Sequence, residues 1–316
     1  MKKVLVSRIL PEEIYPLLDG VEVVRRDQTS VMSEAEMRAA LQEFDGVICT
    51  LGDQFSAEVF ADVPTPRCKI LANFGVGFNH IDTKAAKAAG VTVTNTPGAV
   101  TDATADTAMT LMLMSARRAA EGERLVRSGE WEGWHPTQML GLHLSGKAVG
   151  IVGMGRIGQA IARRCHYGFD MAVHYFGRGP KELDFDATFH PDLSEMASLV
   201  DALVIAVPGG AETTHLIDAK ILAAMRPHGR LINIARGEVV EQRALIEALQ
   251  NETIGGAGLD VYEFEPDVPS ELRDLENVVL LPHLGTATRE VRVDMGRMAV
   301  RNLLAFLQGD TPPNLV

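Results

Sequence analysis

The chain contains little cysteine and no apolar run long enough to cross a bilayer. Only three of its 316 residues are cysteines, and their wide spacing forms neither a disulfide framework nor a C-x-x-C metal pair. We therefore expect buried, inert thiols, a cytoplasmic location and no metal site. Residues 108–114 are among the longest apolar stretches and are far too short for a membrane helix. The amino-terminal residues reach charge too soon for a signal peptide.

Positive charge is also scarce. The chain has 30 basic and 42 acidic residues, a formal net charge of -12, which argues against a general affinity for nucleic acid or anionic membranes. An anionic small-molecule substrate would then need local positive charge, so single arginines become informative. The length, with 46% apolar and 23% charged residues, predicts a globular chain of two domains.

Short β-branched runs alternate with helical patterns through most of the chain, which predicts βαβ units and parallel sheets. The expected strands are 3–7, 45–50, 69–74, 91–95, 147–155, 171–176, 201–207, 229–235, 254–261 and 277–282. Long helical patterns cover about 101–127 and 287–308. We predict an α/β fold with two doubly wound domains. These are a flavodoxin-like substrate domain over 1–98 plus 287–316 and a Rossmann dinucleotide-binding domain over 99–286.

A glycine-rich turn lies directly after one of these strands and opens a helix. Its sequence, "GIVGMGRIGQAIARR", contains Gly153, Gly155 and Gly158 in the spacing G-x-G-x-x-G. Gly153 would allow the tight turn, Gly155 would let the backbone approach a diphosphate, and Gly158 would let the helix pack close to the strand. Amides of the helix N-terminus would then face the diphosphate. This context predicts a dinucleotide site.

The following strand lacks the acid that would normally bind the ribose of NAD. It ends in "AVHYFGRGPKE" (172–182), where Phe176, Gly177 and Arg178 occupy the expected place and Lys181 follows. A guanidinium there suits a 2′-phosphate. We therefore predict a preference for NADP(H), with NAD(H) possible. The alternative is that Arg178 is only a solvated cation in a Gly-Pro turn.

Three more strands end in residues suited to acid–base chemistry on a 2-keto acid. Arg236, Glu265 and His283 each follow a predicted strand, and Asp260 lies near Glu265. Ligands of open α/β sheets bind at the carboxyl ends of strands. The arginine would bind the substrate carboxylate and polarise the ketone, the histidine would donate a proton, and a carboxylate beside the imidazole would stabilise its positive charge. Taken singly, each residue could be a surface ion pair or a turn residue.

Six stretches together make the chain resemble the D-isomer-specific 2-hydroxyacid dehydrogenases over essentially its whole length. They are "FGVGFNHID" (74–82), "NTPGAVTDATADTAMTLML" (95–113), "GIVGMGRIGQAIARR" (150–164), "LINIARGEVV" (231–240), "GLDVYEFEP" (258–266) and "LPHLGTAT" (281–288). The glyoxylate/hydroxypyruvate reductases are the most similar members. The resemblance implies that the catalytic trio is Arg236, Glu265 and His283.

The resemblance also implies further contacts. The backbone at Val76 and Gly77 would bind the substrate carboxylate. The implied cofactor residues, besides the motif glycines and Arg178, are Arg156, Ile157, Val207, Pro208, Thr213, Ala235, Asp260 and Gly285. The segment with Trp131 and Trp134 is similar to one that reaches a neighbouring subunit's active site in relatives, which implies a homodimer and makes Trp134 a substrate-binding candidate. Alternatively, the two tryptophans are aromatic anchors that pack their own loop.

These observations predict an NADPH-dependent reductase that converts glyoxylate, hydroxypyruvate or a related small 2-keto acid to the (D)-2-hydroxy acid. Two alternatives stay open. One is an NAD-dependent dehydrogenase acting on another substrate, and the other is a non-enzymatic, nucleotide-sensing scaffold on the same fold.

Overall fold

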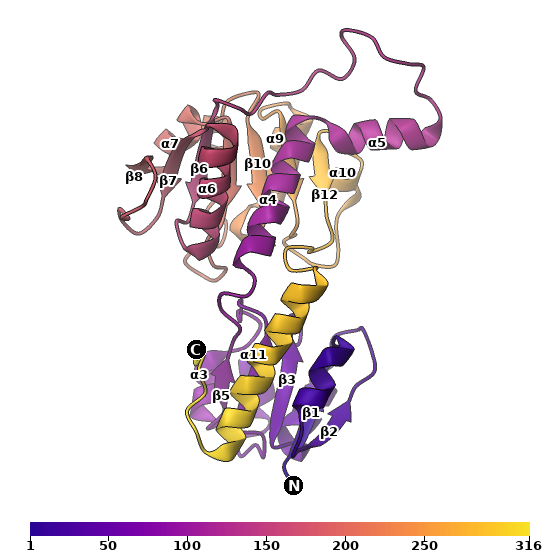
Figure 1. Cartoon of the computed structure of the whole chain (residues 1–316), viewed down its shortest axis with the longest axis vertical. Coiled ribbons are helices and arrows are strands. Elements are labelled where there is room, and N and C mark those ends of the chain that lie inside the picture. The colour runs from indigo at the N-terminus through magenta and orange to yellow at the C-terminus, as the bar shows by residue number, and fades with distance from the viewer. The chain divides into compact units, whose positions relative to one another are not determined.

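The computed structural model describes residues 1–316. The chain forms two compact units: unit 1 is Met1–Val100 with Ala287–Val316, and unit 2 is Thr101–Thr286. Each unit is built on one parallel sheet with helices on its faces (Figure 1). The predicted α/β fold class is therefore confirmed, while the substrate and nucleotide roles stay predictions. No helix is long and apolar enough to span a membrane.

Unit 1 has five strands in the order β2-β1-β3-β4-β5, which is the flavodoxin-like order. The strands are β1 (Lys3–Val6), β2 (Glu22–Arg25), β3 (Gly46–Thr50), β4 (Ile70–Phe74) and β5 (Thr92–Thr94). The helices are η1 (Glu12–Leu17), α1 (Glu34–Glu43), α2 (Ala57–Ala61), α3 (Thr83–Ala88) and α11 (Arg289–Gln308). Strands β3 and β4 are buried along their whole length, because α1 to α3 share a core on one face and α11 packs on β3 and β4.

Unit 2 has seven strands in the order β12-β11-β10-β9-β6-β7-β8, a Rossmann order extended by one strand, with its switch point between β6 and β9. The strands are β6 (Ala148–Val152), β7 (Ala172–Phe176), β8 (Ala187–His190), β9 (Ala202–Ile205), β10 (Arg230–Asn233), β11 (Gly256–Leu259) and β12 (Val278–Leu280). The helices are α4 (Thr101–Ala116), α5 (Ala119–Ser128), α6 (Arg156–Phe169), α7 (Leu193–Leu199), α8 (Ala219–Ala224), η2 (Gly237–Val239), α9 (Gln242–Gln250) and α10 (Ser270–Arg273).

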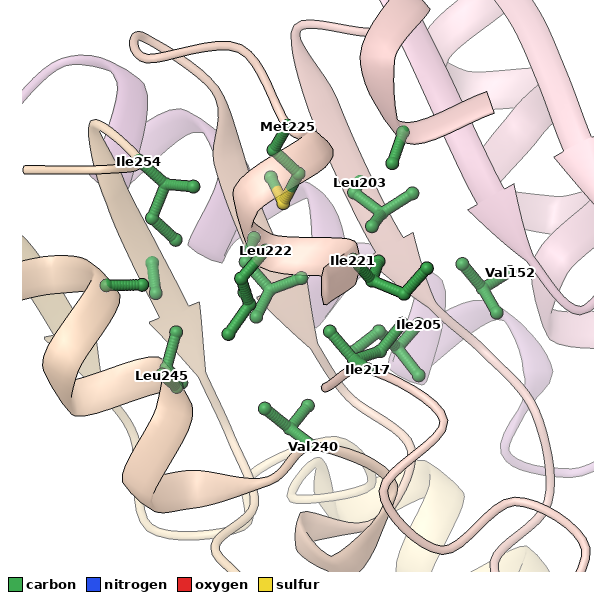
Figure 2. Close-up of a cluster of buried hydrophobic side chains, with 14 of the residues drawn as sticks. Val152, Leu203, Ile205, Ile217, Ile221, Leu222, Met225, Val240, Leu245 and Ile254 are labelled. Atoms are coloured by element: carbon green, nitrogen blue, oxygen red, sulfur yellow. The ribbon is translucent and has the colours of Figure 1, made fainter. Parts of the chain in front are cut away.

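Two apolar clusters fix the sheet of unit 2 between its helices. Helices α4 and α6 cover one face, and α7, α8 and α9 cover the other. Figure 2 shows part of the second cluster, where Ile221 and Leu222 of α8 lie among side chains of β9 such as Ile205. A sheet covered on both faces explains the nearly continuous apolar strands. The carboxyl ends of β6, β9, β10 and β11 are thereby held at one edge.

The structure corrects three details. Strands β2 and β8 were not predicted, because both are short edge strands with partly exposed residues. The single helix expected over 101–127 is wrong, since α4 ends at Ala116 and Arg118 adopts a left-handed conformation (φ 53°). Leu142 donates its amide to the Ala116 carbonyl at 2.7 Å, which removes the acceptor a continuing helix would use.

Candidate active site

The glycine-rich turn after β6 has the shape that a diphosphate requires. Gly153 has φ 101°, and a Cβ there would lie 2.8 Å from the Ala206 carbonyl oxygen. A Cβ on Gly158 would lie 2.0 Å from the Gly153 oxygen, so only glycine lets α6 approach this closely. Gly155 faces open space and caps α6 without a side-chain hydrogen bond. The first α6 amides, including those of Arg156 and Ile157, therefore lack a side-chain cap and suit an anion.

The end of β7 lies beside this turn. The Gly153 amide donates to the Phe176 carbonyl at 2.9 Å, so the segment that starts at Gly177 begins at the same sheet edge. Arg178 is exposed, with no hydrogen bond or ion pair to its guanidinium, and Lys181 is exposed as well. The place where an acid would bind a ribose therefore holds an unpaired cation.

The loop after β9 adjoins the glycine turn from the other side. Val207 is half-buried and Pro208 is exposed, and Thr213 folds the loop back by donating its hydroxyl to the Pro208 carbonyl at 2.7 Å. The predicted cofactor residues of the glycine turn, the end of β7 and the loop after β9 therefore lie at the same edge of the sheet of unit 2.

His283 and Glu265 form a hydrogen-bonded pair. Nδ1 of His283 lies 2.8 Å from Oε2 of Glu265, and each side chain is about a third exposed (30% and 32%). The other carboxylate oxygen accepts the Tyr262 amide at 3.0 Å. Burial raises the pKa of Glu265, but the hydrogen bond and charge of His283 outweigh it, so the pKa lies below its usual value. With Nδ1–H given to an ionised carboxylate, Nε2 is the nitrogen left for a substrate.

Asp260 supports the turn that carries His283. Its buried carboxylate accepts the amides of Leu284 at 2.6 Å and Gly285 at 2.7 Å, and its carbonyl accepts the His283 amide at 3.0 Å. Burial raises the pKa of Asp260. The Thr104 hydroxyl donates to the Gly285 carbonyl at 3.1 Å. These contacts hold His283 at φ 57°, an uncommon conformation for a non-glycine residue.

Arg236 follows β10 and is fixed by its neighbours. Asn233 donates its side-chain amide to the Arg236 carbonyl at 2.9 Å and accepts the Ala235 amide at 3.0 Å. Burial lowers the pKa of Arg236, against the opposing charges of Glu265 and Glu238. The guanidinium is therefore a desolvated cation that interacts with the same carboxylate as His283.

Gly237 allows the Arg236 and Glu265 segments to come together. A Cβ on Gly237 would lie 1.8 Å from the Tyr262 carbonyl carbon, so any other residue would push these backbones apart. Gly237, Asn233, Tyr262 and Thr104 were not predicted from the sequence. Asn233 had a signal, since it is a polar residue that directly follows the apolar Leu231 and Ile232 of β10.

In unit 1, the loop after β4 presents unused backbone donors. Asn73 donates its side-chain amide to the carbonyls of Gly75 at 3.0 Å and Gly77 at 2.9 Å, and Asn95 donates to the Val76 carbonyl at 2.9 Å. The amides of Val76 and Gly77 make no hydrogen bond within the chain. Three successive carbonyls are thus satisfied while two amides stay available for an anion.

The tryptophan loop leaves much of both aromatic side chains exposed. Trp131 is 50% exposed and Trp134 is 79% exposed. Trp134 therefore packs little on its own loop, and both interpretations of the two tryptophans stay predictions.

Known proteins agree with this architecture. Residues 109–285 match the family described as D-isomer specific 2-hydroxyacid dehydrogenase, NAD binding domain. The chain is 43% identical to a glyoxylate reductase of Pyrococcus furiosus over 99% of this chain and 95% of that protein. A crystal structure from Sinorhizobium meliloti, an NADPH-dependent glyoxylate/hydroxypyruvate reductase in complex with NADP and malonate, has a TM-score of 0.89 and 38% identity. That match covers 100% of this chain and 96% of the other.

The fold and these similarities define a nicotinamide-dependent oxidoreductase. More narrowly, the chain belongs to the D-isomer specific 2-hydroxyacid dehydrogenase family.

Proposed function

We propose that this protein is an NADPH-preferring reductase that transfers hydride to C2 of glyoxylate, which gives glycolate, or of hydroxypyruvate, which gives the (D)-2-hydroxy acid. The observation that carries the proposal is the His283–Glu265 hydrogen bond, with the half-buried cation Arg236 interacting with the same carboxylate. Supporting it, relatives that align over nearly the whole chain are named for reactions of these two keto acids.

The residues would divide the chemistry as follows. A reduced nicotinamide cofactor held by its diphosphate at the glycine turn would supply the hydride. His283 donates its Nε2 proton to the carbonyl oxygen, so C=O becomes CH–OH with one hydride and one proton added. Glu265 keeps Nδ1 protonated and offsets the imidazolium charge. Arg236 binds the substrate carboxylate and polarises the ketone, and the amides of Val76 and Gly77 hold the carboxylate.

The cofactor preference rests on charge. An unpaired Arg178 follows β7 where an acid would repel a 2′-phosphate, and Lys181 lies three residues further on. A guanidinium binds phosphate by a charge-assisted fork. The relative from Sinorhizobium meliloti was crystallised with NADP, which is consistent with this assignment.

The test is a matrix of NADPH and NADH against glyoxylate, hydroxypyruvate, pyruvate and phenylpyruvate, followed by the loss of reduced-cofactor absorbance. We expect the highest kcat/KM with NADPH and one of the first two acids. Cofactor binding without turnover of any acid would support the nucleotide-sensing scaffold instead. Faster turnover with NADH would favour the NAD-dependent alternative.

We also propose a homodimer in which the tryptophan loop covers a partner's substrate site. Helix α5, which precedes the loop, has no buried residue, and the loop exposes Trp134 and Leu140 (68%). Such apolar exposure is typical of a surface that another chain covers. Light scattering should give twice the chain mass, and a monomer at all concentrations would rule this out.

A further inference from the structure

The loop that presents the Val76 and Gly77 amides is connected to residues far along the sequence. Asn95 follows β5 and donates its side-chain amide to the Val76 carbonyl at 2.9 Å. If this bond fixes the loop, the residues that orient Asn95 also influence how tightly the loop binds the substrate carboxylate.

Every hydrogen-bonding group of the Asn95 backbone is engaged by the last part of the chain. Its amide donates to the Asn314 carbonyl at 3.2 Å. Its carbonyl accepts the side-chain amide of Asn302 in α11 at 3.0 Å. Asn302 is fully buried, and its side-chain oxygen accepts the side-chain amide of Asn314, also at 3.0 Å. Asn302 therefore has one defined orientation, because its oxygen and nitrogen face different partners.

The segment 310–316 is itself attached to the sheet edge beside Asn95. Leu315 forms an antiparallel bridge with Thr94, and the Val316 amide donates to the Val93 carbonyl at 3.1 Å. The segment thus adds extended backbone to β5 immediately before Asn95. All of these residues belong to unit 1.

We propose that Asn314, Asn302 and Asn95 form a relay by which the segment 310–316 positions the substrate-carboxylate loop. The relay holds the Val76 carbonyl away from the substrate, and the plane of the 76–77 peptide then directs the Gly77 amide toward it. The three asparagines are positioning residues that do not touch the reacting atoms. This inference rests on the proposed function, in which that loop binds the carboxylate.

If the relay operates, each substitution should raise KM, and the effects of two substitutions in the same path should not add. Asn314→Ala should raise KM for the keto acid about threefold, and Asn95→Ala about tenfold, as expected for one net hydrogen bond. The double variant should match Asn95→Ala, because both changes interrupt one path. For all three, kcat should stay within about twofold and NADPH affinity should be unchanged, since neither depends on the loop.

The experiment combines steady-state kinetics with calorimetric binding of oxamate, a non-reacting carboxylate analogue, to the NADPH-loaded enzyme. Thr311→Ala is the control, because Thr311 is exposed in the same segment and its side chain makes no hydrogen bond. It should behave as wild type. Circular dichroism would confirm that each variant is folded.

The outcomes separate the two proposals. Wild-type binding of oxamate without turnover of any keto acid would refute the reductase function, and weaker binding by Asn314→Ala would still support the relay. An active wild type with unchanged KM in folded Asn314→Ala, or with additive effects in the double variant, would overturn the relay.

Discussion

Replacing Glu265 with glutamine tests the acid–base assignment most directly. The two carboxylate oxygens accept from His283 at 2.8 Å and from the Tyr262 amide at 3.0 Å. Glutamine offers one acceptor and one donor, so it can satisfy only one of these partners. If the amide oxygen stays with Tyr262, the glutamine NH2 faces Nδ1 and the imidazolium form of His283 loses its partner.

The size of the effect follows from the hydrogen bond that is lost. A bond to a charged group is worth about 1.5–3 kcal/mol, and partial exposure of this pair places it toward the lower end of that range. We therefore expect kcat/KM for reduction at neutral pH to fall roughly ten- to thirtyfold.

The stability of the protein should depend on pH through the same carboxylate. The pKa of Glu265 is lowered in the folded protein, so its contribution to stability is present above its ordinary pKa and lost as the pH falls through the folded value. The free energy of unfolding of the wild type should therefore decline more than that of Glu265→Gln as the pH falls from about 5 to below 4. Denaturant titrations at several pH values would measure this.

Glu263→Gln is the matched control. Glu263 also holds an imidazole, Nε2 of His215 at 2.7 Å, and also accepts a backbone amide, that of Gln242 at 3.1 Å. We assign it no contact with substrate or cofactor, so Glu263→Gln should change stability but leave kcat/KM unchanged. A Glu265→Gln enzyme with the wild-type rate would refute our assignment of this pair.

Three further predictions concern the cofactor site and the core of unit 1. Arg178→Ala should raise the dissociation constant for NADPH at least about tenfold and that for NADH little; equal effects on both would return Arg178 to an ordinary surface role. Gly158→Ala would place a Cβ 2.0 Å from the Gly153 oxygen, which should cost about 1–3 kcal/mol in unfolding free energy and weaken binding of both cofactors in fluorescence titrations. Asp53, fully buried, accepts four hydrogen bonds, so Asp53→Ala should lower the unfolding free energy by about 3–5 kcal/mol in denaturant titrations, and a loss below about 1 kcal/mol would contradict this role.

The fold class was predictable from the sequence because the spacing of apolar residues and the composition of the strands indicate it. Continuous apolar strands such as β9 are what a doubly covered sheet requires, and the glycine turn marked the first strand of unit 2. The break between α4 and α5 was not predictable locally. It depends on Leu142, which takes the Ala116 carbonyl from a distant position in the sequence. Edge strand β8 was missed because partial exposure weakens its apolar pattern.

The candidate residues were predicted from their positions at strand ends, but the distances between them in the folded protein could not be predicted. Nothing local shows that Gly237 must be glycine, because the reason is the backbone of Tyr262, which belongs to another loop. The resemblance implies that Asp260 lies beside the cofactor, which stays a prediction, and the structure adds that its carboxylate accepts the two amides of the His283 turn. From the sequence alone, a carboxylate that supports a loop of the site cannot be distinguished from one that binds a ligand.

A common device explains why the functional loops are well defined in both units. Asn73 is the penultimate residue of β4, Asn233 ends β10 and Asp260 directly follows β11, and each is at most 1% exposed. A buried polar side chain must be hydrogen-bonded, and at a strand end the nearest groups are those of the loop that leaves the sheet. Each of these residues accordingly holds two backbone groups of a functional loop, through contacts of 2.6–3.0 Å. A polar residue at the end of a run of apolar strand residues therefore predicts that its side chain holds the following loop by hydrogen bonds. This prediction can be made from the sequence alone.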